Sequence, residues 1–599
     1  ALRGPPAGVA MSPDRSRLLL REAVGSEFEL AVTDRHGRER IATLPLPTFP
    51  RQYAWAPDAA RVAFLADSGR DRTFELSVWD TRDGRVVRPP VPPITSLAVP
   101  TPIAWSPDGR RMAFLAPAAD SVRRLYLLDP DDARTAPRVV LDSLAPHAGI
   151  AWSPDGRRLA TVRDSTPGEL TLVGADGAGR ARVPVAPGGR LHDLAWSADG
   201  ARMLMVVSWK DADFNQLAEV ELATGRVRAL TAEPGRVASP HYSPDGASYS
   251  FAVHAGGEVR TMLCARAGGC RRLGPDGGIS VFMRFAGAGD SVFFWRSSPY
   301  AAAAVRAEEV RTGRASVLYA PMPENAIDSA GAERLSIPAP DGVRLPAYLW
   351  RGRRVWGHRP ALVIAVPGGP AAHQEFAWEP RFEYLHRAGI DVVTFNYRGQ
   401  AGFGSEFLHA PGDEEARARD VLAVRDYAVR TLGIPPERVA IYGHSYGAYV
   451  AMRAAAMREL PGPLVVVSTW GALPDSTFRV KPRCVAAFNG GADERIDPGA
   501  SRKVVEAWLG EASTREPCGH FRVFPGERHW FEDPQPWAVV YATLVSMLPQ
   551  GPNPLRTLHR SWLAMAHPLP VVAPLPGGLA PPGGGPGARP MAVNGEGKR

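Results

Sequence analysis

The sequence predicts an all-β seven-bladed β-propeller followed by a doubly wound α/β domain with a mostly parallel sheet. Two observations predict this order: a short turn phrase recurs through the first half of the chain, and apolar runs alternate with helical stretches through the second half. The 599 residues are enough to bury two separate cores. We expect the propeller at 1–325, the α/β domain at 326–550, and a mostly disordered tail rich in proline and glycine at 551–599.

The repeat is a turn phrase whose copies lie roughly 43–50 residues apart, a period typical of propeller blades with four short strands. The copies read MSPDR, WAPDA, WSPDG, WSPDG, WSADG, YSPDG and a degenerate FAGAG. They begin at Met11, Trp55, Trp105, Trp152, Trp196, Tyr242 and Phe285. In most copies the aromatic ends one strand, proline and glycine shape the turn, and a second strand follows. One blade cannot bury both faces of its sheet, whereas seven blades in a closed ring can.

The second half of the chain alternates between apparent strands and helices from about residue 330 onward. Its apolar runs are ALVIAV, IDVVTFNY, RVAIYG, LVVVST, CVAAFNG and FRVFPG. Short apolar runs of this kind are typical of parallel strands that helices cover on both faces. In such a sheet the functional side chains gather at the carboxyl ends of the strands. We therefore expect the catalytic residues in the loops that follow these runs.

The clearest candidate residue is Ser445, in the segment GHSYGAY at residues 443–449. This G-x-S-x-G motif stands between the strand RVAIY and a helix, which is the context of the nucleophile elbow in an α/β-hydrolase domain. Gly443 and Gly447 leave room for a tight turn that lifts the serine off the sheet. The helix that follows directs its first amides toward developing negative charge. The motif therefore predicts that Ser445 is a catalytic nucleophile.

The partners of a nucleophilic serine follow in the order acid, then histidine. Asp493 comes directly after the strand CVAAFNG, whereas its competitors Glu494 and Asp497 lie further along the same loop. His529 follows the strand FRVFPG, whereas His520 precedes that strand and would lie at the wrong end of the sheet. In such a triad the serine attacks a carbonyl, the histidine moves the proton, and the aspartate orients the imidazole.

Stabilising the oxyanion requires two N–H donors near the nucleophile. One is the backbone N–H of Tyr446, the residue after the nucleophile, and we place the second at Gly369 in the loop PGGPAAH. Tyr446 and Trp470 are also candidates for lining the substrate pocket, although Trp470 fits a core position equally well.

Together these segments resemble the prolyl oligopeptidase family of serine peptidases, in particular its acylaminoacyl-peptidase-like branch, over roughly residues 9–550. The blades precede the hydrolase domain as they do in that family. GHSYGAY is similar to the family's nucleophile elbow and VPGGP to its oxyanion strip. FNYRGQAGFGSEF, GGADERIDP and FPGERHWF are similar to three further family segments, the last two holding the acid and the histidine. The resemblance implies a peptidase for short peptides, with the propeller covering the active-site mouth and no cofactor.

Three departures from the family pattern limit what the resemblance implies. Pro367 replaces a side chain that can donate a hydrogen bond at the head of the oxyanion strip, and Ala448 replaces a glycine. Only 48 residues separate Ser445 from Asp493, fewer than the family usually has. The residues of the family's specificity pocket therefore cannot be assigned to positions in this sequence. An esterase on the same scaffold, and a propeller binding protein with a degenerate hydrolase domain, stay open as alternatives.

The composition of the chain indicates which kinds of partner the protein binds and in which cellular compartment it works. The net charge of +8 comes mostly from dispersed arginines without a dense basic block, which does not favour nucleic acid. No apolar run is long enough for a membrane helix, and no cluster of metal ligands is visible. Cys264 with Cys270, and Cys484 with Cys518, are plausible disulfide pairs that favour a secreted or periplasmic location, with a cytoplasmic one as the alternative. The start at Ala1 fits either a processed chain or a fragment, and a homo-oligomer is left open.

Overall fold

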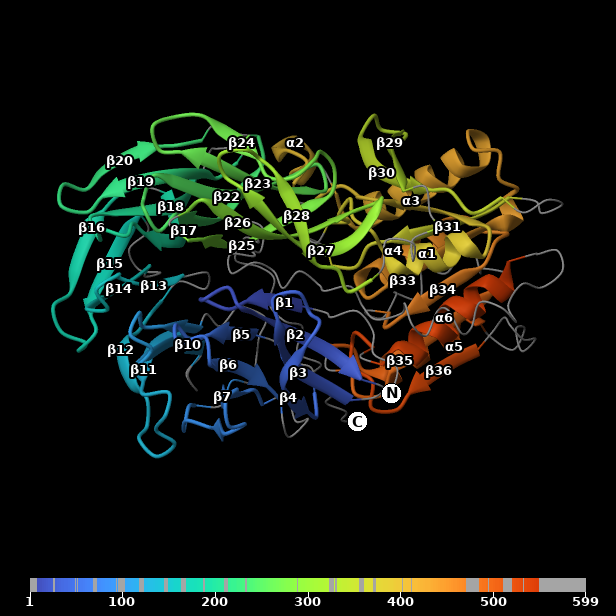
Figure 1. The fold of residues 1–599 in the computed structure, drawn as a ribbon. Helices are drawn as coiled ribbons and strands as arrows, with labels where there is room; N and C mark the ends of the chain where they lie inside the picture. Colours follow the sequence, from blue (N-terminus) through green and yellow to red (C-terminus); the bar gives the residue numbers. More distant parts are fainter. Residues whose placement is uncertain are drawn as a thin grey trace, which may run out of the picture.

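The structure is a computed structural model in which a ring of blades stands beside an α/β domain (Figure 1). It describes residues 8–548 except 25–26, 49, 51, 68–72, 93, 95–102, 118–122, 145–148, 163–167, 187–188, 210–213, 232–233, 288, 323–327, 329–330, 355–359, 370–372, 401, 411, 470–483, 494, 510–519 and 532. The predicted tail, the predicted boundary at residue 325, and the candidate Trp470 lie outside the described residues.

The described strands of the first half form seven antiparallel blades of four strands each, and a parallel pairing of β23 with β25 links blades six and seven into one eight-stranded sheet. This arrangement confirms the predicted propeller. Blades one to three are β1 (Gly8–Met11), β2 (Arg17–Val24), β3 (Glu27–Asp34) and β4 (Arg40–Leu46); β5 (Gln52–Trp55), β6 (Arg61–Ala66), β7 (Glu75–Asp80) and β8 (Val86–Val87); and β9 (Ile103–Trp105), β10 (Met112–Pro117), β11 (Arg123–Leu128) and β12 (Arg138–Leu141).

Blades four to seven continue in chain order around the ring (Figure 1). They are β13 (Ile150–Trp152), β14 (Arg158–Val162), β15 (Glu169–Gly174) and β16 (Ala181–Pro184); β17 (Gly189–Trp196), β18 (Arg202–Trp209), β19 (Gln216–Glu221) and β20 (Arg226–Ala229); β21 (Arg236–Tyr242), β22 (Ser248–Ala255), β23 (Glu258–Ala265) and β24 (Cys270–Arg272); and β25 (Ile279–Ala286), β26 (Ser291–Ser298), β27 (Ala301–Glu309) and β28 (Ala315–Tyr319).

The aromatic residue of the turn phrase joins each of several blades to the one before it. The indole N–H of Trp152 donates to the carbonyl of Ala104 in the preceding blade at 3.0 Å. The Arg111 guanidinium lies 5.3 Å from the centre of the Trp152 ring and donates to the Gly156 carbonyl at 3.0 Å. The same indole-to-carbonyl bond joins Trp55 to Ala10, Trp105 to Ala54 and Trp196 to Ala151. The repeat therefore encodes contacts between blades as well as turns within them.

Apolar packing between the first and last blades closes the ring. Leu18 and Leu20 of β2 belong to one buried cluster with Phe293, Trp295 and Val305 of blade seven. The first and last blades belong to different sheets, so side-chain packing holds them together at this closing interface.

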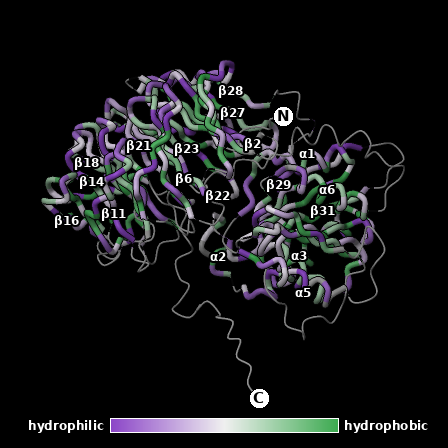
Figure 2. The backbone as a smooth tube through the Cα atoms, turned by 90° about the horizontal axis from the view of Figure 1, so that it is seen from below, coloured by the Kyte–Doolittle hydropathy of each residue, from purple (hydrophilic) through white to green (hydrophobic). Residues whose placement is uncertain are grey.

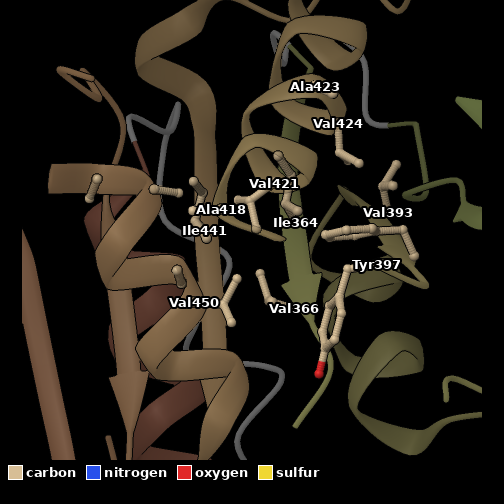
Figure 3. Packing of buried hydrophobic residues seen from close by; sticks show 14 of the residues in the cluster. Ile364, Val366, Val393, Tyr397, Ala418, Val421, Ala423, Val424, Ile441 and Val450 are labelled. Carbon is tan, nitrogen blue, oxygen red and sulfur yellow. The ribbon is translucent and has the colours of Figure 1, made fainter. Parts of the chain in front are cut away.

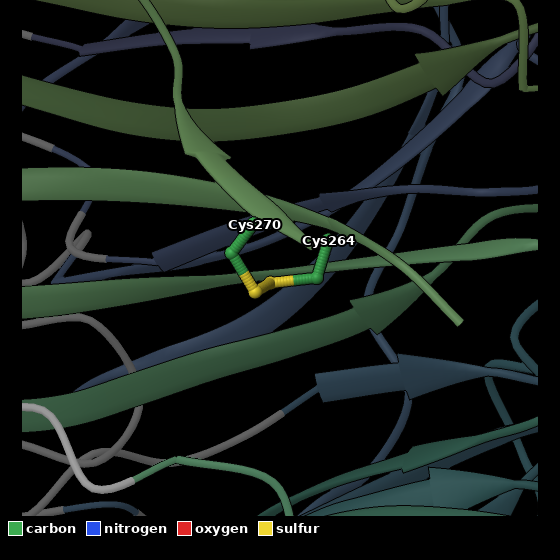
Figure 4. Close-up of a disulfide and its surroundings, with 2 residues drawn as sticks. All are labelled: Cys264 and Cys270. Atoms are coloured by element: carbon green, nitrogen blue, oxygen red, sulfur yellow. A yellow bond between two sulfur atoms is a disulfide. The ribbon is translucent and has the colours of Figure 1, made fainter. Parts of the chain in front are cut away.

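One expected disulfide is present in blade six. Cys264 of β23 and Cys270 of β24 are directly opposite in the antiparallel register, and their sulfurs are bonded (Figure 4). The bond therefore ties the outer strand of this blade to its neighbour. Cys518, the expected partner of Cys484, lies outside the described residues, so that pairing stays a prediction.

The α/β domain is built on one eight-stranded sheet in the order β29-β30-β32-β31-β33-β34-β35-β36. Its strands are β29 (Ala332–Pro338), β30 (Arg344–Trp350), β31 (Ala361–Val366), β32 (Ile390–Phe395), β33 (Val439–His444), β34 (Leu464–Val467), β35 (Val485–Gly490) and β36 (His520–Phe524). β30 pairs antiparallel with both β29 and β32, and the strands from β32 to β36 pair in parallel. This order confirms the predicted doubly wound, mostly parallel sheet.

Helices cover both faces of this sheet. They are α1 (Pro380–Arg387), α2 (Ser405–Leu408), α3 (Glu414–Arg430), α4 (Tyr446–Met457), α5 (Pro498–Leu509) and α6 (Pro534–Met547), with a 3-10 turn at Pro436–Arg438. On one face Val421 of α3 and Val450 of α4 pack with Ile364 and Ile441 of the sheet (Figure 3). The hydrophobic residues accordingly gather around β31 in the middle of the domain (Figure 2). None of the helices in the described part of the chain is long and apolar enough to cross a bilayer.

The tryptophan contacts between blades predict a stability effect. Trp152→Phe keeps an aromatic ring but removes the N–H that reaches the Ala104 carbonyl. We therefore expect the free energy of unfolding to fall by about 1–2 kcal/mol. The exposed Trp209, with 38% of its surface accessible, serves as control, and Trp209→Phe should change stability by less than about 0.5 kcal/mol. Urea unfolding measures both, and equal effects of the two substitutions would contradict a role for the inter-blade bond.

Candidate active site

Ser445 occupies the turn between β33 and α4 in a strained backbone conformation. Its φ of 57° and ψ of −128° lie outside the regions that residues with a Cβ normally adopt. A Cβ on Gly443 would lie 2.5 Å from the Gly447 carbonyl oxygen, and one on Gly447 would lie 2.5 Å from the Pro367 carbonyl oxygen. Both flanking positions therefore accept only glycine, as the motif predicts.

The three residues predicted as a triad meet at the carboxyl ends of their strands. His529 Nε2 lies 2.8 Å from the Ser445 hydroxyl oxygen, and His529 Nδ1 lies 3.0 Å from each carboxylate oxygen of Asp493. An ionised carboxylate only accepts hydrogen bonds, so Nδ1 carries the proton and Nε2 is free to accept from the serine. The geometry is that of a nucleophile, a base and an orienting acid.

Asp493 is held ionised by its surroundings. Burial by itself would raise the pKa of this carboxyl group, but hydrogen bonds from His529 and from the backbone N–H groups of Arg495 and Ile496 hold the pKa below its ordinary value. The two backbone bonds are each 2.9 Å long. The carboxylate is therefore preorganised to face the imidazole.

The predicted competitors of these residues are placed elsewhere or are not described. The Asp497 carboxylate accepts from the backbone N–H groups of Gly499 and Ala500 at the start of α5. His520 begins β36, whereas His529 follows the other end of that strand. Glu494 lies outside the described residues.

The predicted oxyanion strip lies against the nucleophile. A Cβ placed on Gly368 would be 3.6 Å from the Ser445 Cβ. Gly369 has a φ of +67°, which favours glycine. The Tyr397 hydroxyl donates to the Gly369 carbonyl at 2.5 Å and so anchors the strip from the end of β32. Sequence reasoning missed this role of Tyr397, because the segment NYRG carries no sign of which carbonyl its tyrosine reaches.

Tyr446 begins α4 directly after the nucleophile, and its side chain is buried. Its ring packs 6.2 Å from the ring of Tyr397 and 5.8 Å from that of Tyr449, and the Arg417 guanidinium donates to its hydroxyl. The side chain is thus fixed by aromatic neighbours and a cation. The pocket role expected for it stays a prediction.

The propeller contacts loops on two sides of this site. Arg528, the residue before His529, forms a buried ion pair with Asp67 at the end of β6, across 461 positions of the sequence. In blade six the Gly256 N–H donates to the Gly402 carbonyl at 2.8 Å, and the Phe376 N–H donates to the Gly257 carbonyl at 2.6 Å. The propeller therefore packs against the histidine loop and against the loops near the oxyanion strip.

Two carboxyl groups of like charge lie close together in the segment after the oxyanion strip. Burial and the nearby Glu379 raise the pKa of Glu375 to about 7. Glu379 itself accepts from Arg381 at 2.7 Å. Elsewhere in the described residues, no group of three or more histidine, cysteine, aspartate or glutamate side chains is arranged to hold a metal ion.

Comparison with known proteins finds sequence similarity in the α/β domain. Residues 375–460 match the model of the prolyl oligopeptidase family. Dipeptidyl aminopeptidase BIII of Pseudoxanthomonas mexicana is 33% identical over 93 residues, which are 15% of this chain and 14% of that protein. Acylamino-acid-releasing enzyme 1 of Oryza sativa subsp. japonica is 28% identical over 134 residues, which are 21% of this chain and 16% of that protein. The matched segments thus span about a sixth of these relatives.

Over the whole chain the likeness is one of fold. The solved structure of a Mycobacterium tuberculosis puromycin-hydrolyzing peptidase superimposes with a TM-score of 0.69 at 18% identity, covering 97% of this chain and 95% of that chain. Fold and site together define a β-propeller joined to an α/β-hydrolase domain, a class to which serine peptidases belong. The predicted resemblance to the prolyl oligopeptidase family is confirmed in sequence over residues 375–460. Over nearly the full length the solved structure shows a shared fold.

The raised pKa of Glu375 predicts a pH-dependent effect on stability. The folded protein keeps this proton up to about pH 7, whereas an ordinary glutamate loses it near pH 4.5, so burial of Glu375 costs stability as the pH rises through that window. Glu375→Gln should therefore raise the melting temperature at pH 8 and leave it nearly unchanged at pH 4.5. Thermal unfolding at the two pH values measures this difference.

Glu379→Gln is the matched control for that experiment. It removes the partner of Arg381, so it should lower the melting temperature at pH 8. A stabilising effect of both substitutions, or of neither, would contradict the assignment of the raised pKa to Glu375.

The strained turn predicts opposite behaviour for two substitutions that both remove the Ser445 hydroxyl. Glycine tolerates the observed φ and alanine does not, so Ser445→Gly should be about 1–2 kcal/mol more stable than Ser445→Ala. Chemical unfolding of the two variants measures the difference. Equal stabilities would mean that the turn relaxes in solution.

Proposed function

We propose that this chain is a serine peptidase that hydrolyses short peptides through an acyl-enzyme on Ser445. The observation that carries the proposal is the continuous path from the Ser445 hydroxyl through His529 to Asp493, with separations of 2.8 and 3.0 Å. A buried relay of this kind, on a strained turn at a strand end, suits nucleophilic attack on a carbonyl. The relatives named above are peptidases, which supports the same class.

The proposed reaction runs in two steps. His529 Nε2 accepts the Ser445 proton as the oxygen attacks the scissile carbonyl, and it then returns that proton to the leaving amine. Asp493 keeps the imidazole in the required tautomer and stabilises the imidazolium. Water, activated by the same histidine, then hydrolyses the acyl-enzyme and releases the second product.

The negative charge of each tetrahedral intermediate needs donors beside Ser445. We assign these to the backbone N–H of Tyr446 and to the backbone N–H of Gly369, as the motif predicts. Pro367 supplies no side-chain donor, so in this chain backbone groups would stabilise the oxyanion. Loss of one such donor typically costs about 3–4 kcal/mol of transition-state stabilisation.

Short peptides are the proposed substrates because the propeller contacts loops on two sides of the site. Its contacts through Asp67 to Arg528, and through Gly257 to Phe376, support a mouth that folded proteins would not enter. No cofactor is needed for this chemistry. The Cys264–Cys270 disulfide supports a secreted or periplasmic location for the protein.

The same constellation would also cleave activated esters, so an esterase is the second candidate. A propeller binding protein with a degenerate hydrolase domain is the third candidate, and it requires an unreactive Ser445. The short segment between Ser445 and Asp493 favours keeping this third candidate, because fewer residues are present there to shape a peptide pocket.

A fluorophosphonate probe tests the nucleophile directly. We expect it to label the folded wild-type protein and to leave Ser445→Ala unlabelled, because only the activated hydroxyl reacts. Asp493→Asn should lower kcat by on the order of 10⁴-fold, because the imidazole would lose its orienting carboxylate. Mass spectrometry locates the label. A wild-type protein that folds but takes no label would favour the binding role.

A substrate panel separates the remaining candidates. N-acetylated, free-amine and proline-containing short peptides are compared with simple esters, using wild type and Ser445→Ala side by side. The peptidase proposal expects turnover of at least one peptide class that disappears in Ser445→Ala. Turnover of esters alone would replace the peptidase proposal with the esterase.

A further inference from the structure

His444, the residue immediately before the nucleophile, reaches the histidine loop. It ends β33, its side chain is buried, and its Nε2 lies 2.8 Å from the main-chain carbonyl oxygen of His529. The Ser468 hydroxyl, just beyond the neighbouring strand β34, donates to the same carbonyl at 3.4 Å. The backbone of the candidate base is thus held from two adjacent strand ends.

The direction of the His444 bond follows from the chemistry of its partner. A carbonyl oxygen only accepts, so Nε2 must carry the proton and donate it. Burial and the neighbouring His529 lower the pKa of His444 to about 3, which keeps the ring neutral and its other nitrogen unprotonated. A second imidazolium beside His529, which would oppose protonation of that base, is thereby avoided.

The His444 ring also contacts two elements whose relative positions matter for the proposed reaction. Its centre lies 5.1 Å from that of His529 and 4.7 Å from the Trp530 ring. Its Nδ1 lies 3.8 Å from the place that a Cβ would take on Gly368 in the oxyanion strip. One ring therefore contacts the histidine loop and the strip while it is attached to the strand that carries Ser445.

The backbone at Ser468 gives independent support. This serine is fully buried and has a φ of 47°, a left-handed conformation that is uncommon for residues with a Cβ. Its N–H donates to the Phe488 carbonyl at 2.8 Å, so the conformation is fixed by the sheet. Glycine would fit this conformation more easily, but it would lack the hydroxyl that reaches His529. Strained positions of this kind cluster at functional sites.

We propose that His444 and Ser468 are positioning residues, which hold the main chain of His529 so that its imidazole faces the Ser445 hydroxyl. This inference rests on the proposed function, because it assigns a second layer of residues to the same reaction. Neither side chain needs to touch substrate. Their loss should therefore slow the chemical step and leave the affinity for substrate nearly unchanged.

Three variants test this role. His444→Phe keeps a ring against Trp530 but has no donor, and we expect kcat to fall about 10- to 100-fold with KM within about twofold. His444→Gln restores an N–H donor and should recover part of that loss. Ser468→Ala removes the longer bond and should lower kcat only about two- to fivefold. Thermal unfolding of each variant verifies that it is folded.

The outcomes separate this inference from the proposed function. If wild type reacts with fluorophosphonate and His444→Phe keeps its kcat within twofold, or changes KM alone, the positioning role is overturned and the proposed function stands. A loss that His444→Gln does not recover at all would assign the effect to ring packing and would also overturn it. If His444→Phe does not fold, the test uses the other two variants. Lowered kcat values of His444→Gln and Ser468→Ala support the positioning role, and wild-type kcat values of both overturn it. A folded wild type without reactivity would remove the proposed function itself.

Discussion

The turn that carries Ser445 constrains the rest of the α/β domain. Its φ of 57° is tolerable only because α4 and β33 hold both sides of it, and Gly443 and Gly447 let those elements approach. The close approach brings the carbonyl oxygen of Pro367 against Gly447, which places the oxyanion strip beside the nucleophile. A larger residue at Gly443 would push α4 away from β33, and one at Gly447 would push the end of β31 and the oxyanion strip away from the nucleophile.

Around that turn, hydrogen bonds from the same loop or from other elements fix the residues of the candidate site. Asp493 is oriented by backbone N–H groups of its own loop, whereas Gly369 is anchored by Tyr397 from the end of β32. His444 donates to the main-chain carbonyl of His529. The neighbouring Arg528 forms an ion pair with Asp67 of the propeller. The propeller is therefore part of the scaffold that supports the histidine loop.

Much of this could be predicted from sequence because the signals are local. The turn phrase repeats with its aromatic residue in place, and Ser445 stands in a motif whose glycines have a steric cause. Asp493 and His529 follow strands of a parallel sheet, so their meeting was predictable from topology. Tyr397 and His444 were not predictable, because nothing in NYRG or GHSYG indicates which distant carbonyl each side chain reaches. Trp470 lies outside the described residues, and its pocket role stays a prediction.

The amino-acid sequence by itself determined the blade repeat, the alternation of strands and helices, and the chain order of serine, aspartate and histidine. These depend on turn chemistry and hydrophobic pattern, which act over a few residues. Only the tertiary structure decided that Asp67 pairs with Arg528, and that His444 and Ser468 share the carbonyl of His529. Such contacts join residues far apart in the chain, so they exist only where the packing of blades and strand ends brings them within hydrogen-bond distance.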